Sequence, residues 1–147
     1  MSLKEKLLSN MKEAMKAKDS VKLGTVRSVI SAVKNQEIEL KKELSEEEIL
    51  TIVSREVKKR KEASVLYEKG NRPELKDKEI QEMKILQTYL PEQVSEKDLR
   101  RRIQEVIAET GAEGMKDFGK IMKTLVPEFK GKADNGLIKE LANEYLN

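Results

Sequence analysis

The clearest pattern in this chain is a recurrence of apolar residues at spacings of three and four, which is the period of an amphipathic α-helix. The first stripe begins after Ser2, which forms a capping box with Glu5. The apolar positions up to residue 90 are Leu3, Leu7, Met11 and Met15, then Val26, Val29, Ile30, Val33 and Leu40, then Ile49, Ile52 and Val53, then Leu75, Ile80, Met83, Leu86 and Leu90. Four helices are therefore predicted in this part of the chain.

Residues suited to helix ends separate these stripes. They are Asp19 or Ser20, Ser45 with Glu48, Gly70 with Asn71, and Pro73 and Pro91. The third helix runs from Ser45 to about Lys69, and a continuous helix of about 24 residues is about 36 Å long. We therefore expect the N-terminal part to be an elongated helical bundle.

Beyond Pro91 the predicted helices become shorter. Ser95 with Asp98 starts a helix that glycines end, and Asp134 is a possible cap for the last one. The apolar positions are Leu99, Ile103, Val106 and Ile107, then Phe118, Ile121, Met122 and Leu125 before Pro127, then Leu137, Ile138, Leu141 and Tyr145. The predicted fold is all-α, with an N-terminal domain over residues 1–93 and a small three-helix domain over residues 94–147.

Composition supports a charged, helical protein. Of the 147 residues, 39% are charged and only 3% are aromatic, and the net charge is +3, so any RNA binding must come from local clusters of charge. With no Cys and no His, the usual ligands for zinc are missing, and we expect no metal and no cofactor. The chain has no long apolar run and no apolar signal segment after Met1, so we expect a cytoplasmic protein that does not bind membranes.

Three groups of cations are candidates for binding a nucleic acid. The candidate residues are Lys120, Lys123, Lys130, Gly131 and Lys132 near the C-terminus, Lys58, Lys59, Arg60 and Lys61 in the third helix, and Arg100 and Arg101 in the fifth. A glycine between lysines lets a phosphate approach the backbone closely. The alternative for each group is an ordinary solvated surface.

Two of these groups contain ambiguous positions. Arg60 is four residues after Glu56, and both are in phase with the apolar face of their helix, so the pair is either a structural bridge or part of a recognition site. Three consecutive arginines, 100–102, fan around a helix, and we expect Arg100 and Arg101 to be the exposed pair.

Catalytic patterns are weak by comparison. Residues 114–120 match a GxxxxGK phosphate loop, but Ile121 stands where Ser or Thr must follow, and a helix precedes the glycine in place of a strand. Three glutamates, 46–48, occupy a first helical turn, where capping explains them. We expect no catalytic residue.

Several motifs resemble the GatB/YqeY family. Residues 117–123, DFGKIMK, and 130–134, KGKAD, resemble the tail domain of the B subunit of tRNA-dependent amidotransferase, although that tail usually has Asn-Pro after its Ala. Residues 34–40, 56–64 and 89–93 resemble the small stand-alone YqeY proteins. The tail domain contacts tRNA in the amidotransferase, so the resemblance implies a non-catalytic protein that binds tRNA or another structured RNA.

Two other functions stay open. One is a protein-docking adaptor in an aminoacylation or amidation assembly, with the N-terminal bundle as the docking part. The other is a component of a carbon-nitrogen ligase that uses glutamine as amido donor, although the sequence offers no nucleophile with a base beside it.

Overall fold

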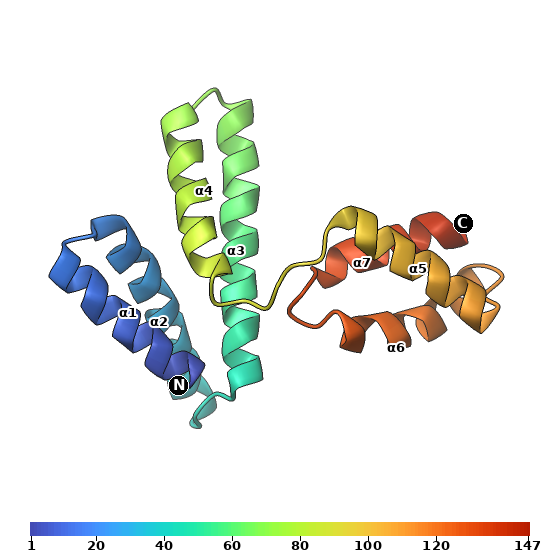
Figure 1. Cartoon of the computed structure of the whole chain (residues 1–147), viewed down its shortest axis with the longest axis horizontal. Coiled ribbons are helices and arrows are strands. Elements are labelled where there is room, and N and C mark those ends of the chain that lie inside the picture. Colours follow the sequence, from blue (N-terminus) through green and yellow to red (C-terminus); the bar gives the residue numbers. More distant parts are fainter. The chain divides into compact units, whose positions relative to one another are not determined.

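The computed structural model describes all residues, 1–147, and every regular element in it is a helix, which confirms the all-α prediction (Figure 1). The α-helices are α1 Leu3–Ala17, α2 Ser20–Leu40, α3 Glu46–Lys69, α4 Pro73–Gln87, α5 Glu96–Thr110, α6 Phe118–Glu128 and α7 Asn135–Leu146, with a short 3₁₀ helix at Met115–Asp117. The chain divides into two compact units, Met1–Leu90 and Pro91–Asn147. None of the helices combines the length and the apolar character needed to span a bilayer.

The helix starts follow the local signals in the sequence. Ser45 Oγ accepts the Glu48 N–H at 3.2 Å while the Glu48 carboxylate accepts the Ser45 N–H at 3.1 Å, which confirms the capping box of α3. Asp19 caps α2 and Ser95 caps α5 with one hydrogen bond each: the side chain accepts the N–H of the residue three positions later. These bonds satisfy N–H groups that a helix start otherwise leaves without a partner.

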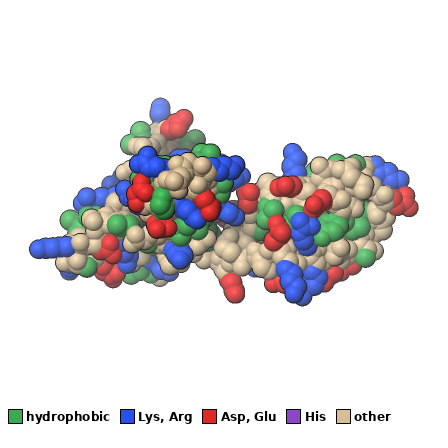
Figure 2. Space-filling model, turned by 90° about the horizontal axis from the view of Figure 1, so that it is seen from above, with side chains coloured by type: hydrophobic (Ala, Val, Ile, Leu, Met, Phe, Trp, Pro, Cys, Tyr) green, Lys and Arg blue, Asp and Glu red, His purple; other side chains and the backbone are tan.

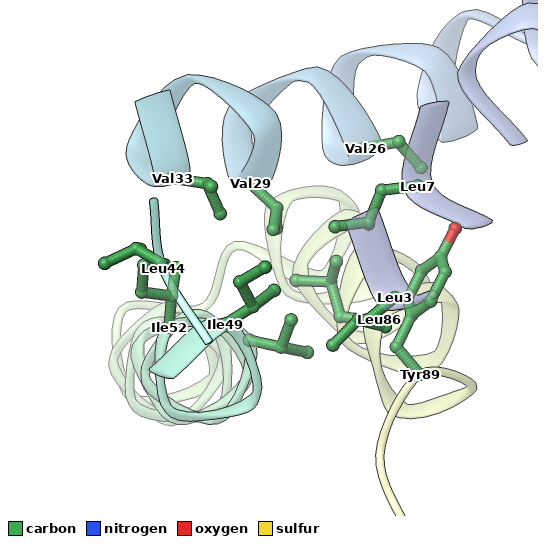
Figure 3. Close-up of a cluster of buried hydrophobic side chains, with 11 residues drawn as sticks. Leu3, Leu7, Val26, Val29, Val33, Leu44, Ile49, Ile52, Leu86 and Tyr89 are labelled. Carbon is green, nitrogen blue, oxygen red and sulfur yellow. The ribbon is translucent and has the colours of Figure 1, made fainter. Parts of the chain in front are cut away.

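In the N-terminal unit, α1 pairs with α2 and α3 pairs with α4, and the two hairpins share one apolar core (Figure 1). Figure 3 shows side chains from all four helices meeting there, among them Leu7, Val29, Ile49 and Leu86. Each is at most 2% exposed, and burying a side chain of this size stabilises the fold by roughly 1.5–3 kcal/mol.

In the C-terminal unit, α5, α6 and α7 surround a second core. Its fully buried side chains include Leu99, Ile103, Ile121, Leu125 and Ile138. The stripes predicted from the sequence therefore form the core of this unit.

Several details differ from the prediction. Leu40 is 46% exposed and does not join the core. Helix α4 ends at Gln87 rather than at Pro91, and α6 continues past Pro127 to Glu128, because a proline in the last turn removes only one helical hydrogen bond. Asp134 occupies the position before α7, but its carboxylate accepts no hydrogen bond from that helix.

Candidate nucleic-acid interface

The outward face of α6 carries two of the predicted lysines. Ile121 and Leu125 are fully buried against the core, whereas Lys120 and Lys123 are exposed. At 100° per residue these two lysines lie opposite the buried pair. The Lys120 ammonium also donates to the Thr110 carbonyl at 3.3 Å, at the end of α5.

The loop after α6 carries two more exposed lysines, Lys130 and Lys132, on either side of Gly131. Gly131 has φ of 76°, a left-handed conformation that glycine adopts without strain. A Cβ added there would lie 3.7 Å from the ring of Pro91, in ordinary contact, so backbone conformation and not space is what requires glycine.

Residues 91–94 hold this loop in place. The Gln93 side-chain amide donates to the Gly131 carbonyl at 2.8 Å and to the Pro91 carbonyl at 2.9 Å. The Val94 N–H donates to the Lys132 carbonyl at 3.0 Å. The two lysines therefore project from a braced turn, which reduces the conformational entropy lost when they bind a partner.

One carboxylate, Glu128, lies within residues 118–132, and it is bound by an arginine. Arg102 donates to it through two nitrogens, Nε at 2.8 Å and Nη2 at 2.9 Å. This hydrogen-bonded arginine, aided by the charge of Lys132, holds the pKa of Glu128 below its ordinary value of 4.5. Arg102 thus offsets the only negative charge among four lysines, and the segment keeps a local positive charge, with Asp117 and Asp134 at its two ends.

The other two arginines of α5 differ in exposure. The Arg101 side chain is 70% exposed, with loose contacts to Asp98 at 3.7 Å and Glu105 at 3.9 Å. Arg100 is 35% exposed and binds Glu144 at 3.0 Å. Its guanidinium lies 5.8 Å from the centre of the Tyr145 ring.

The expectation of an exposed pair therefore holds for Arg101 and is wrong for Arg100. Arg100 lies within reach of α7, where its guanidinium donates hydrogen bonds to the Glu144 carboxylate and the Tyr145 hydroxyl. That contact joins residues more than forty positions apart, so the spacing within α5 gave no sign of it.

The cation run in α3 is split between two faces of that helix. Lys58, Lys59 and Lys61 are exposed, and Lys59 lies 3.4 Å from Glu56. Arg60 points inward, and its side chain is only 13% exposed. The run of four cations predicted from the sequence is therefore a surface group of three lysines.

Arg60 connects three helices. Its Nη1 donates to the Glu56 carbonyl oxygen at 3.1 Å, and its Nη2 donates to Ser28 Oγ of α2 at 3.1 Å. The carboxylates of Glu56 and of Glu82 in α4 each lie 3.6 Å away. Of the two alternatives for the Glu56 and Arg60 pair, this geometry favours the structural bridge.

The remaining acidic and glycine motifs have structural roles. Glu46 Oε1 accepts the Leu3 N–H at 2.9 Å, so it caps α1 from the start of α3. Gly114 precedes the 3₁₀ helix and follows α5, which is not the strand context of a phosphate loop. No group of acidic side chains in the structure has the arrangement of a metal site.

Charges of both signs mix over most of the surface. Figure 2 shows Lys and Arg alternating with Asp and Glu over the visible face of the molecule. Residues 118–132, with four lysines and one bound carboxylate, depart locally from this mixture, as do residues 55–61, which hold five cations and Glu56. Sequence reasoning found the lysines of residues 118–132 but missed Gln93, Arg102 and Glu128, whose contacts across 26 and 38 residues leave no local pattern.

Comparison with known proteins shows the family of this chain. The model of the Yqey-like protein family matches residues 4–146. A protein of Vanderwaltozyma polyspora is 34% identical, with 96% of this chain and 80% of the relative covered. One from Kluyveromyces lactis is also 34% identical over 84% and 72% of the two chains, and one from Saccharomyces cerevisiae is 30% identical over 87% and 68%. All three are named Altered inheritance of mitochondria protein 41, mitochondrial.

These names contradict the cytoplasmic location expected from the sequence, because they assign the relatives to mitochondria. The expectation depended on the lack of an apolar signal segment. An apolar segment is the mark of secretory signals, whereas mitochondrial targeting uses amphipathic, arginine-rich segments. The lack of an apolar segment therefore could not distinguish a cytoplasmic from a mitochondrial protein.

Proposed function

Since this chain belongs to the Yqey-like protein family, we propose that it is a non-catalytic protein that binds tRNA or another structured RNA. The binding surface is the basic α6 surface, defined as Lys120, Lys123, Lys130, Gly131 and Lys132. Lys58, Lys59 and Lys61 of α3 are a second proposed contact surface, in the N-terminal unit, and Arg101 of α5 is a further proposed contact.

One observation carries this proposal. Four exposed lysines occur within residues 118–132, and the one carboxylate among them is bound by Arg102 at 2.8 and 2.9 Å. Exposed ammonium groups can displace counterions from a phosphate backbone, and the arginine bound to Glu128 offsets the one negative charge within this segment. The resemblance to the amidotransferase tail domain, which contacts tRNA, supports the same conclusion.

The aromatic residues indicate how the RNA is recognised. The chain has only 3 Tyr and 2 Phe. Tyr89 and Phe129 are buried, and Tyr145 lies against Arg100. With so few rings available to stack on unpaired bases, recognition relies on phosphates and on the shape of folded RNA.

A mobility-shift titration with total tRNA tests the proposal. The wild type is compared with the triple variant Lys123→Gln, Lys130→Gln, Lys132→Gln at two salt concentrations. A matched control, Lys6→Gln, Lys12→Gln, Lys16→Gln, removes the same charge from exposed positions of α1. The four lysines of the basic α6 surface should contribute about −3 to the slope of log affinity against log salt, and the surface variant should lower the magnitude of the slope by about 2 to 3.

The control variant should leave both the affinity and the slope close to those of the wild type. Equal losses in the two variants would mean that only the net charge matters, and this would contradict a localised surface. Binding that is absent, or that does not respond to salt, would contradict RNA binding itself. Release of ammonia from glutamine by the purified protein would contradict the non-catalytic part of the proposal.

A further inference from the structure

An uncharged side chain, Gln93, holds the turn from which two lysines of the basic α6 surface project. Its amide nitrogen donates to the Gly131 carbonyl at 2.8 Å and to the Pro91 carbonyl at 2.9 Å. A side-chain amide has two N–H donors, and both are used here. One side chain therefore ties the segment that begins the C-terminal unit to a turn 38 residues later.

The chemistry of these contacts allows only one orientation of the amide. Both neighbours are carbonyl oxygens, which accept hydrogen bonds and cannot donate them. A flipped amide would place its own oxygen against these two acceptors. Methionine has about the length of glutamine but no N–H donor, so Gln93→Met removes both bonds without changing the charge of the protein.

The turn is also held by backbone hydrogen bonds on either side of Gly131. The Lys132 N–H donates to the Phe129 carbonyl at 2.8 Å, and the Lys132 carbonyl accepts the Val94 N–H at 3.0 Å. Phe129 is 7% exposed and belongs to the core of this unit. The Gln93 amide holds the Gly131 carbonyl, so the backbone between the two lysines is ordered before any partner binds.

An ordered turn favours one class of polyanion. Folded RNA presents phosphates at spacings that its helices keep constant, whereas an unstructured strand can adapt its backbone to the protein. A turn that is already ordered loses less conformational entropy when it binds a rigid target. A mobile turn would lose this advantage with folded RNA but much less of it with a flexible strand, because strand and turn could both adjust.

We propose that Gln93 makes the basic α6 surface prefer folded RNA to unstructured RNA. Gln93 is a positioning residue, and it acts through Lys130 and Lys132. This inference rests on the proposed function and adds to it the class of RNA that is preferred and a determinant outside the charged segment.

Anisotropy titrations of the full chain with labelled tRNA and with labelled poly(U), which lacks stable secondary structure, test this preference. Gln93→Met should weaken tRNA binding about threefold, since the turn must then be ordered on binding. Its affinity for poly(U) should stay close to that of the wild type, so the preference for tRNA should fall by about the same factor. The matched control, Gln104→Met, removes an exposed amide from α5 of the same unit and should change neither affinity.

A second background separates positioning from a general loss of structure. In a variant that already carries Lys130→Gln and Lys132→Gln, Gln93→Met should weaken tRNA binding no further, because side chains that act together are not additive. Hydrogen exchange of the RNA-free protein gives a readout independent of binding. Gln93→Met should speed exchange of the Lys132 and Val94 amides, while the thermal midpoint should stay close to that of the wild type because Gln93 is exposed.

The outcomes separate this proposal from the proposed function. Unchanged exchange would show that Gln93 does not order the turn, and an unchanged preference for tRNA over poly(U) would overturn its role in specificity. A further loss of affinity in the background without the two lysines would also contradict the proposal. A wild type that binds both RNAs equally well would refute this proposal alone, whereas one that binds neither would refute RNA binding and this proposal together.

Discussion

Arg60 in the N-terminal unit and Arg102 in the C-terminal unit each bind acidic side chains. Arg60 does so on the core-facing side of α3, and Arg102 does so at the surface of α5. Arg60 is in phase with Ile49, Ile52 and Val53, and its side chain is 13% exposed. Arg102 is 29% exposed and reaches across the surface to Glu128. The same chemistry therefore holds helices together in one unit and shapes a charged surface in the other.

The difference shows that a cation cannot be assigned to binding by its type alone. Its helical phase relative to the apolar stripe decides whether its charge becomes part of the packing or faces a partner. In α3 the phase places Arg60 inward and Lys58, Lys59 and Lys61 outward. In α6 the phase keeps both Lys120 and Lys123 outward.

The largest expected effect comes from breaking the inner network. Arg60→Ala should destabilise the N-terminal unit by about 3 kcal/mol, because the largely buried carboxylates of Glu56 and Glu82 lose their partner. Urea unfolding gives the size of the loss, and hydrogen exchange read by mass spectrometry assigns it to a unit. Equal loss of protection in residues 91–147 would contradict the comparison.

A compensated variant sharpens this test. Arg60→Met combined with Glu56→Gln and Glu82→Gln removes all three charges together. Replacing a buried ionic group by neutral side chains is often close to neutral for stability. The triple variant should therefore recover most of the stability that Arg60→Ala loses.

A smaller effect is expected at the helix caps. Ser45→Ala should cost about 1 kcal/mol in the N-terminal unit, because it removes one of the two bonds of the capping box. Ser95→Ala should cost about as much in the C-terminal unit, where the cap is one-sided. Hydrogen exchange of the two helix starts would separate these losses, and a loss at α3 on mutation of Ser95 would contradict a local role.

Arg102→Gln should change binding more than stability. It exposes the negative charge of Glu128 beside Lys132 and should weaken tRNA binding about threefold, while surface ion pairs contribute little to folding. Glu128→Gln should have the opposite sign, and the double variant should bind like the wild type. Anisotropy titration with labelled tRNA measures all three, and an unchanged affinity for Arg102→Gln would refute the screening role.

The smallest effect is the response to acid. The pKa of Glu37 in the N-terminal unit and of Glu128 in the C-terminal unit is lowered from 4.5 in the folded state. A carboxyl with a lowered folded pKa stabilises the fold above its unfolded pKa and loses that contribution as the pH falls through the folded value. Glu37→Gln and Glu128→Gln should each flatten the fall in thermal midpoint below about pH 4.5, and a steeper fall would reverse the assigned sign.

Features coded by neighbouring residues could be predicted from the sequence. The capping box of Ser45 and Glu48, the cap at Asp19 and the core face of α5 all depend on residues a few positions apart, and all are present. The phase of Arg60 also pointed inward. Prolines were less reliable, because Pro127 lies inside the last turn of α6.

Features that depend on distant pairs could not be predicted. Arg60 finds Ser28 across 32 residues, Arg100 finds Glu144 across 44, and Arg102 finds Glu128 across 26. Each pairing follows from how the helices pack, which the spacing of apolar residues leaves undetermined. The lysines of the candidate surface could therefore be found in the sequence, but the pairing of Glu128 with Arg102 could not.

Lysine footprinting tests the central claim most directly. The full chain is acetylated briefly with and without saturating tRNA, and the modification of each lysine is read by mass spectrometry. The account predicts protection of Lys123, Lys130 and Lys132, with Lys6, Lys12 and Lys16 of α1 modified equally in both samples. Uniform protection of all lysines, or protection confined to α1, would contradict a localised electrostatic surface on α6.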